Sequence, residues 1–207
     1  MLTKPKINIA VLVSGGGTNL QALIDAQKSG LIQSGEIRLV LSNNPDAYAL
    51  KRAKDNDIPT AVVTKKEAGS RAAMEDRIVA TLEQYRIDLI VLAGFMCILS
   101  EKFTKKYDRR ILNVHPSLIP SFCGEGFYGL KVHEAALEKG VKVTGATVHF
   151  VNEIPDGGEI ILQKAVKVLD RDTPQTLQAR VMKQAEWIIL PRAVEKVSKQ
   201  MTEGNTV

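Results

Sequence analysis

The chain has 207 residues, of which 44% are hydrophobic and 25% are charged, and its net charge is +5. This length and composition are typical of one globular domain over residues 1–207, and the absence of repeats and low-complexity blocks argues against a solenoid or a disordered protein. The positive charge is modest and spread out, and no basic stripe carries interleaved aromatic residues, so we expect small anionic substrates rather than a nucleic acid or a membrane. The sequence leaves the oligomeric state open.

The first predicted strand covers residues 7–13. Lysines precede it and small residues follow, which superficially resembles a signal peptide, but the apolar run is at the short end of the range and a buried strand explains it better. Only Cys97 and Cys123 are present, and no Cys or His cluster has zinc-ligand spacing. We therefore expect a cytoplasmic protein with no metal.

Apolar runs rich in β-branched residues then alternate with helical patterns. Strands are predicted near 36–43, 60–63, 88–94 and 110–115, and helices near 18–27, 46–56 and 71–85. This alternation indicates an α/β fold with an open, mostly parallel twisted sheet covered by helices on both faces.

After residue 115 the pattern changes, because the runs 142–151 and 158–168 have only a turn-rich segment between them. They are predicted to pair as antiparallel strands at one edge of the sheet. A final helix over 173–194 closes the domain, and Pro191 is expected to kink or end it.

The first strand ends in SGGGTNLQ. Gly15, Gly16 and Gly17 allow tight turns and close approach of a ligand, Thr18 with Gln21 fits a capping box, and a helix N-terminus offers N–H groups to an anion. We interpret this loop as a phosphate cradle. The loop is a weak dinucleotide fingerprint, because the pattern G-x-G-x-x-G would need glycine where the chain has Leu20. A Walker loop is excluded, since no GK[ST] follows. The alternative is that the glycines only make a sharp turn.

The segment ILNVHPSLIP places Asn113 and His115 two residues apart, so in a strand they point to the same side. Asn113 can donate to a developing oxyanion, and His115 can exchange a proton near neutral pH. Asp156 in IPDGGEI is expected to lie within reach and to raise the pKa of His115. The alternative is structural, since a His before Pro and a DGG sequence both occur in turns.

Five segments, SGGGTNLQALID, VLAGFMCILS, NVHPSLIPSF, TGATVHFV and DGGEIILQ, occur in this order over nearly the whole chain. Together they resemble the glycinamide ribonucleotide formyltransferases of purine biosynthesis, a branch of the folate-dependent formyltransferase family. The methionyl-tRNA branch is similar only in its core and has a further C-terminal domain. The deformylase branch usually has an added N-terminal domain and a different first loop.

The resemblance implies a Rossmann-like formyltransferase fold, with a phosphate-binding half over about 1–100 and a catalytic and folate-binding half over about 101–207. It implies 10-formyltetrahydrofolate as the formyl donor, without a metal. The substrate residues would be Gly17, Thr18 and Asn19 at the 5′-phosphate and Glu186 at the ribose. The folate pocket would comprise Arg71, Met96, Cys97, Ile98, Leu99 and Asn113, although family members often have arginine where this chain has Cys97.

The resemblance also implies the reaction: the amine of glycinamide ribonucleotide attacks the formyl carbon directly. Asn113 and protonated His115 would stabilise the tetrahedral oxyanion, with Asp156 as the third catalytic residue, and no Ser or Cys sits in a nucleophile elbow. Two other classes stay open, namely a 10-formyltetrahydrofolate hydrolase and a non-catalytic ribonucleotide-binding module.

The segment SFCGEGFYG, residues 121–129, is predicted to be a mobile lid, because it has three glycines and directly follows the catalytic strand. The two other histidines are expected to be structural. His133 is expected at the surface or at a helix cap, and His149 lies in an apolar alternation.

Overall fold

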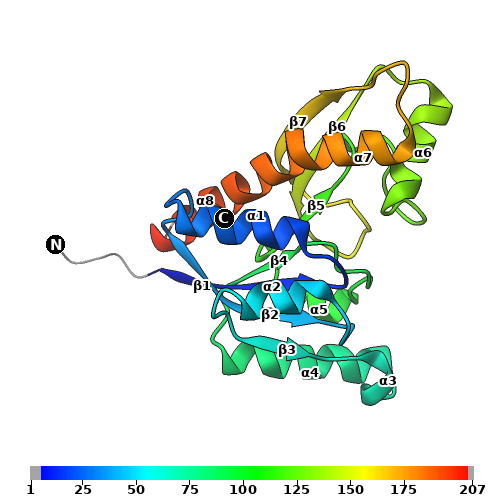
Figure 1. The fold of residues 1–207 in the computed structure, drawn as a ribbon. Helices are drawn as coiled ribbons and strands as arrows, with labels where there is room; N and C mark the ends of the chain where they lie inside the picture. Colours follow the sequence, from blue (N-terminus) through cyan, green and yellow to red (C-terminus); the bar gives the residue numbers. More distant parts are fainter. Residues whose placement is uncertain (1–5, 205–207) are drawn as a thin grey trace.

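Within residues 6–204, the part of the chain that the computed structural model describes, seven strands form one sheet in the order β3-β2-β1-β4-β5-β6-β7 (Figure 1). The strands are β1 (Ile7–Val13), β2 (Gly35–Ser42), β3 (Thr60–Val62), β4 (Leu89–Leu92), β5 (Ile111–His115), β6 (Val143–Phe150) and β7 (Ile160–Lys167). The neighbours from β3 to β5 pair in parallel, whereas β6 is antiparallel to both β5 and β7. The predicted α/β sheet with an antiparallel edge is confirmed.

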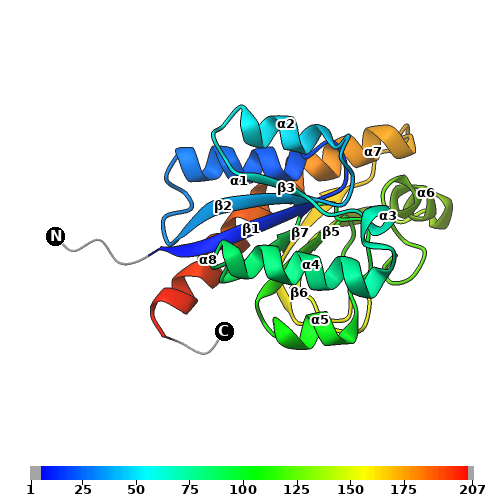
Figure 2. The ribbon, with the colours of Figure 1, turned by 90° about the horizontal axis from the view of Figure 1, so that it is seen from below.

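Helices cover both faces of this sheet (Figure 2). One face carries α1 (Thr18–Lys28), α2 (Tyr48–Lys54), α6 (Leu130–Lys139), α7 (Pro174–Val181) and α8 (Trp187–Thr202). The other face carries α4 (Arg71–Gln84) and α5 (Glu101–Lys106), and the short helix α3 (Lys65–Ala68) precedes α4. No helix within residues 6–204 is both long and apolar enough to cross a membrane.

The first strand shows why both faces must be covered. Ile9, Val11 and Val13 pack into the core beneath α1 and α8, while Ala10 and Leu12 pack into the core beneath α4. All five are fully buried. A strand that is apolar on both faces is stable only between two layers of helices, because burial of apolar surface provides most of the driving force.

The C-terminal helical region differs from the prediction. It is two α-helices joined by a π-helical segment, Met182–Glu186, and α8 continues through Pro191 to Thr202. Pro191 is itself buried with Leu190 and Val194 on the face that packs against the sheet. Burial of this face offsets the roughly 3 kcal/mol that a proline costs inside a helix. The expectation that Pro191 ends the helix is therefore wrong.

The sequence interpretation also missed three helices, α3, α5 and α6. Two of them are very short, and a four- or six-residue helix carries little periodicity. The longer one, α6, follows the glycine-rich segment after β5, and no element is predicted for its residues.

Candidate active site

The strand order reverses between β1 and β4, and open α/β sheets bind ligands beyond the carboxyl ends of the strands at such a point. The loops after these two strands are joined at their base by hydrogen bonds. The N–H of Ser14 donates to the carbonyl of Gly94 over 3.1 Å, and the N–H of Met96 donates to Oγ of Ser14 over 2.7 Å. The glycine loop and the 93–100 loop therefore form one rigid wall at the point where α/β folds bind ligands.

Gly17 is the residue of the glycine loop whose conformation requires glycine. It is the N-cap of α1 with a left-handed φ of 71°, and a Cβ there would lie 2.6 Å from Cβ of Ala49. The loop is braced by Arg52, whose Nε donates to the carbonyl of Gly16 over 2.8 Å. Gly15 and Gly16 have open space where a side chain would point.

The predicted capping box is wrong, because α1 has no side-chain cap and begins at the left-handed Gly17. The side chain of Gln21 instead bonds to Asp25 over 2.9 Å and to Arg52 over 3.1 Å. The first N–H groups of α1 consequently have no side-chain acceptor, which suits an anion.

Asn19 and Glu186 meet although they are 167 residues apart, with Nδ2 of Asn19 donating to Oε2 of Glu186 over 2.7 Å. Glu186 ends the π-helical segment and is 6% exposed. Burial raises the pKa of its carboxyl to about 7, although the hydrogen bond from Asn19 acts in the opposite direction. The other amide atom, Oδ1 of Asn19, is buried without a partner. The pair offers both an acceptor and a protonatable oxygen to a polyhydroxylated ligand.

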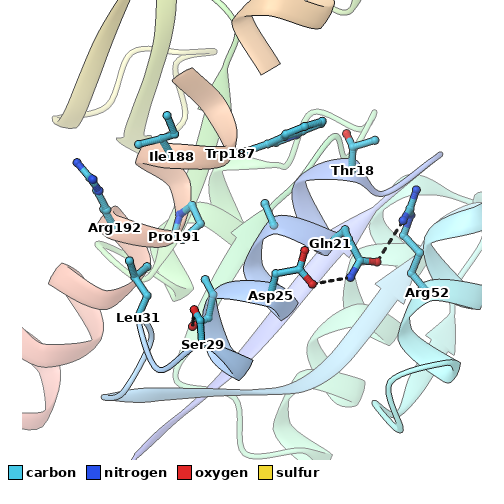
Figure 3. Close-up of a pocket in the computed structure, with 12 residues that line it drawn as sticks. Thr18, Gln21, Asp25, Ser29, Leu31, Arg52, Trp187, Ile188, Pro191 and Arg192 are labelled. Carbon is cyan, nitrogen blue, oxygen red and sulfur yellow. Dashed lines mark hydrogen bonds between the residues drawn. The ribbon is translucent and has the colours of Figure 1, made fainter. Parts of the chain in front are cut away.

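A groove of about 590 Å³ runs between α1 and α8 from this point (Figure 3). Thr18 and Arg52 lie at one end, and Trp187, directly after Glu186, forms part of the opposite wall. The groove lies beside the predicted phosphate site, and neither Asn113 nor His115 lines it.

The predicted catalytic residues converge at the end of β5. Asn113 and His115 project from this strand, and the loop between β6 and β7 brings Asp156 back to them. Asp156 has a left-handed φ of 55°, and a Cβ on Gly158 would lie 1.8 Å from the carbonyl oxygen of Phe150. The DGG sequence is therefore needed for the loop to close against the end of β6.

The carboxylate of Asp156 has two histidine neighbours. Its Oδ2 lies 3.5 Å from Nδ1 of His115, and its Oδ1 lies 3.5 Å from Nε2 of His149. Oδ2 also accepts the N–H of Gly124 over 2.8 Å. Burial opposes ionisation of Asp156, but the hydrogen bond to His149, the charge of His115 and the Gly124 N–H together hold its pKa below the usual value.

The pKa of His115 departs from the prediction. It is lowered, because burial of a ring that is only 4% exposed outweighs the upward effects of Asp156 and of the Phe122 carbonyl. Asp156 does raise the pKa of His115, as predicted, but the predicted net increase of that pKa is wrong. Burial of the imidazole was not visible in the sequence.

The predicted lid segment, residues 121–129, lies directly against these groups. The carbonyl of Phe122 lies 2.8 Å from Nε2 of His115, and the Gly124 N–H reaches Asp156. Phe122, Gly124, Gly126 and Gly129 all have positive φ values. The loop thus contacts the imidazole on the side opposite to Asp156.

The predicted folate residues lie in two neighbouring segments. Arg71 begins α4, and its Nε donates over 3.1 Å to Glu75, which is 5% exposed. Glu75 also accepts the backbone N–H of Ser100 over 2.9 Å and the Ser100 hydroxyl. One buried carboxylate therefore links Arg71 to the end of the 93–100 loop, a role that no sequence pattern indicates.

In that loop Met96 and Ile98 are each 56% exposed, whereas Leu99 is buried. Exposed apolar side chains at a strand end suit a flat heteroaromatic ligand such as a pteridine. Cys97 is partly buried, and burial raises the pKa of its thiol. It offers no fixed positive charge at this point of the loop.

The two histidines expected to be structural differ from each other. His133 is completely buried in α6, so a surface or cap position is wrong, and burial lowers its pKa to about 4. His149 pairs with Asn113 across β5 and β6, and its Nε2 lies 3.2 Å from Nδ2 of Asn113. The alternation in TVHFV predicts which side of the strand His149 faces. That Asn113 is its neighbour depends on the register between β5 and β6, which the sequence does not reveal.

Among the described residues, no group of three or more His, Cys, Asp or Glu side chains is arranged to hold a metal ion. The polar atoms that converge on the end of β5 are instead an amide, an imidazole and a carboxylate, which suit proton transfer and oxyanion stabilisation.

Comparisons with known proteins agree with this chemistry. A family model described as formyl transferase matches residues 7–194. The chain is 45% identical over 196 residues to a phosphoribosylglycinamide formyltransferase of Haemophilus influenzae, covering 95% of this chain and 87% of that protein. The crystal structure of glycinamide ribonucleotide transformylase 1 from Symbiobacterium toebii superposes with a TM-score of 0.88 at 40% identity, covering 98% of this chain and 90% of that chain.

A further relative is the trifunctional purine biosynthetic protein adenosine-3 of Gallus gallus, which is 47% identical over 193 residues. These residues are 93% of this chain but only 18% of that protein. The similarity therefore concerns one part of the trifunctional protein.

Proposed function

The chain belongs to the formyl transferase family, and we propose that it transfers a formyl group from 10-formyltetrahydrofolate to the amine of glycinamide ribonucleotide. This is a step of de novo purine biosynthesis. The observation that carries the proposal is the convergence of Asn113, His115 and Asp156 at the end of β5, in a sheet whose first helix begins without a side-chain cap.

The N-terminal half, about 1–100, would hold the phosphate of glycinamide ribonucleotide. Gly17, Thr18 and Asn19 occupy the start of α1, where free N–H groups and the helix dipole favour an anion. Glu186 would accept a hydrogen bond from a ribose hydroxyl, because its carboxyl is already held by Asn19. The amine would then point toward β5.

The C-terminal half, about 101–207, would supply the catalytic residues, and Asn113 would join the folate pocket to residues that precede this half. Met96 and Ile98 would cover the pteridine, with Cys97 and Leu99 completing that wall, and Arg71 would face the negatively charged tail. Glu75 holds Arg71 and the 93–100 loop in place together. Since Cys97 adds no positive charge, Arg71 would supply the electrostatic attraction in this part of the pocket.

Asn113 and His115 would act on the reacting atoms. The amine nitrogen forms a bond to the formyl carbon and the carbonyl oxygen becomes an oxyanion, which donors from Asn113 and His115 stabilise. The oxyanion then collapses and the bond from carbon to N10 of the folate breaks. The proton that the amine loses must reach N10, and His115 is the carrier, directly or through water.

The surroundings of His115 support this role. Phe122 O and Asp156 Oδ2 flank its two ring nitrogens, and both are acceptors, so the charged ring can donate on both sides. Burial opposes the charge and keeps the pKa below its ordinary value. A lowered pKa makes the charged ring a stronger acid, which suits delivery of its proton to N10.

We also propose a cytoplasmic location, which two free cysteines support. The hydrolase alternative would use the same three residues to activate water, and the binding-module alternative would use only the glycine loop. Folate absorbance, followed with and without glycinamide ribonucleotide, separates the three. We expect a change that requires glycinamide ribonucleotide; a change without it indicates the hydrolase, and no change indicates the binding module.

A further inference from the structure

The loops after three neighbouring strands meet at one hydroxyl group, that of Ser14. The strand β1 lies between β2 and β4 in the sheet, and Ser14 directly follows β1. Its Oγ accepts the N–H of Met96, from the loop after β4, over 2.7 Å. It donates to Oδ1 of Asn43, from the loop after β2, over 2.7 Å. One side chain at the end of β1 is therefore tied to the loops on both sides.

Asn43 fixes the direction of this hydroxyl. A serine hydroxyl carries one hydrogen and two lone pairs. Because the hydrogen points to the amide oxygen of Asn43, a lone pair remains for the N–H of Met96, and the bond that the hydroxyl donates strengthens the one that it accepts. The loop after β2 is also held to Ser14 directly, since Nδ2 of Asn44 donates to its carbonyl over 3.3 Å. Asn43 therefore acts on Met96 through Ser14.

The hydroxyl bond reaches further into the 93–100 loop than the backbone bond does. The backbone N–H of Ser14 meets Gly94 at the start of the loop, where a left-handed φ of 75° turns the chain. The far end of the loop is held at Ser100 by Glu75. The residues proposed to cover the pteridine extend from the hydroxyl bond to this far attachment, so their position depends on both.

Ser14 also leads directly into the glycine loop, residues 15–17, which is proposed to hold the phosphate. Each loop keeps its own contacts to its own substrate, so the hydroxyl sets the position of one substrate relative to the other more than the affinity for either. We propose that Ser14, oriented by Asn43, is a positioning residue that aligns the amine of glycinamide ribonucleotide with the formyl carbon. This inference rests on the proposed function, because it concerns the same two substrates.

The test separates alignment from binding. The single-turnover rate of formyl transfer is measured with both substrates saturating. The Kd for glycinamide ribonucleotide alone and for tetrahydrofolate alone, which lacks the formyl group and cannot react, is measured by calorimetry. Ser14→Ala should lower the rate about tenfold, since a misplacement of about 1 Å can cost about 10²-fold. Both Kd values should change by less than about threefold, because each loop keeps its own contacts.

Two variants of Asn43 test whether it acts through Ser14. Asn43→Ala removes the acceptor and should lower the rate, whereas Asn43→Asp keeps an acceptor for the hydroxyl and should restore the rate at saturating substrate. In the Ser14→Ala background, Asn43→Ala should change the rate by less than about twofold. Ser29→Ala is the matched control. It removes a hydroxyl that bonds locally to the carbonyl of Ala26 over 3.2 Å, and the rate should not change.

An unchanged rate in Ser14→Ala would overturn the proposal, and so would losses from Ser14→Ala and Asn43→Ala that multiply in the double mutant. A loss accompanied by weaker binding of one substrate alone would assign the hydroxyl to that pocket and would also overturn it. If Ser14→Ala does not fold, equal rates in Asn43→Ala and Asn43→Asp would overturn it. These results differ from a failure of the proposed function, in which the wild-type protein itself would not formylate glycinamide ribonucleotide.

Discussion

Nδ1 of His115 lies 3.5 Å from Oδ2 of Asp156, yet burial keeps the pKa of this imidazole below its ordinary value. Asp156 therefore raises the pKa of His115, but by less than burial lowers it. We predict that Asp156→Asn moves the NMR titration midpoint of His115 to still lower pH and lowers turnover most on the alkaline side. Glu153→Gln, an exposed carboxylate in the same loop, is the control. An unmoved His115 midpoint would remove Asp156 from the proton transfer.

The lowered pKa of His115 also sets the sign of a stability effect. The unfolded chain binds the proton more tightly, so this histidine contributes stability above the unfolded pKa of about 6.5, and the contribution is lost as pH falls. This direction is opposite to the one that a raised pKa would give. Urea unfolding of the wild type and His115→Gln across this range should converge at low pH. A difference that grows as pH falls would contradict the assignment.

The contact between Phe122 and His115 gives a prediction for the loop 121–129. For His115 to deliver its proton through Nε2, the Phe122 carbonyl must move away from that nitrogen. We expect amide hydrogen exchange in this loop to be measurable in the free protein and to slow when both substrates bind. Exchange in the buried strand β2 serves as the internal reference. Complete protection in the free protein would rule out a lid.

Gly16 and Gly17 form a matched pair for the phosphate loop. Gly17→Ala would strain a left-handed residue and press Cβ against Ala49, so we predict a loss of about 1–3 kcal/mol of stability. Gly16→Ala has open space and should keep the Tm. If the open side of Gly16 faces the phosphate, this variant should raise the KM for glycinamide ribonucleotide and spare the folate KM. Equal changes in both KM values would argue against a phosphate site there.

The buried carboxyl of Glu186 should also make the stability of the protein depend on pH. Burial raises the pKa of its carboxyl to about 7, so the folded protein holds this proton more tightly than the unfolded chain. Its contribution to stability is present at low pH and falls as pH rises from about 4.5 toward the folded value, by on the order of 3 kcal/mol. Glu186→Gln should flatten this dependence. If Glu186→Gln and the wild type show the same pH profile of the unfolding free energy, the carboxyl of Glu186 is ionised in the folded protein and its pKa is not raised.

The sequence predicted the parts of the site that depend on one strand at a time. Asn113 and His115 are placed together by the period of a strand, and Gly17 by a strand-to-helix turn. It did not predict contacts that depend on the register between strands or on the path of a loop. His149 stands beside Asn113 because β6 runs antiparallel to β5, and the Phe122 carbonyl reaches His115 because the loop folds back.

Burial was the other property that the sequence did not show. The net pKa of His115 and the completely buried position of His133 both depend on how distant segments pack around these rings, which a local sequence pattern does not show. Similarly, local preference predicts that Pro191 kinks or ends a helix, and the packing of α8 against the sheet allows the helix to continue past it.

The role of Asn113 gives a kinetic prediction. Asn113→Ala should lower kcat by roughly 10²-fold, because an oxyanion donor acts mainly in the transition state. The KM for each substrate should change much less. A change confined to KM would show that Asn113 only lines the pocket.

The fate of the formyl carbon tests the central claim most directly. 10-Formyltetrahydrofolate labelled with ¹³C in the formyl group is incubated with the protein and glycinamide ribonucleotide, and the products are followed by ¹³C NMR. We predict that the label appears on the amine of glycinamide ribonucleotide, and that His115→Gln and Asp156→Asn slow its appearance. Label that appears as formate at the same rate with and without glycinamide ribonucleotide would contradict the account.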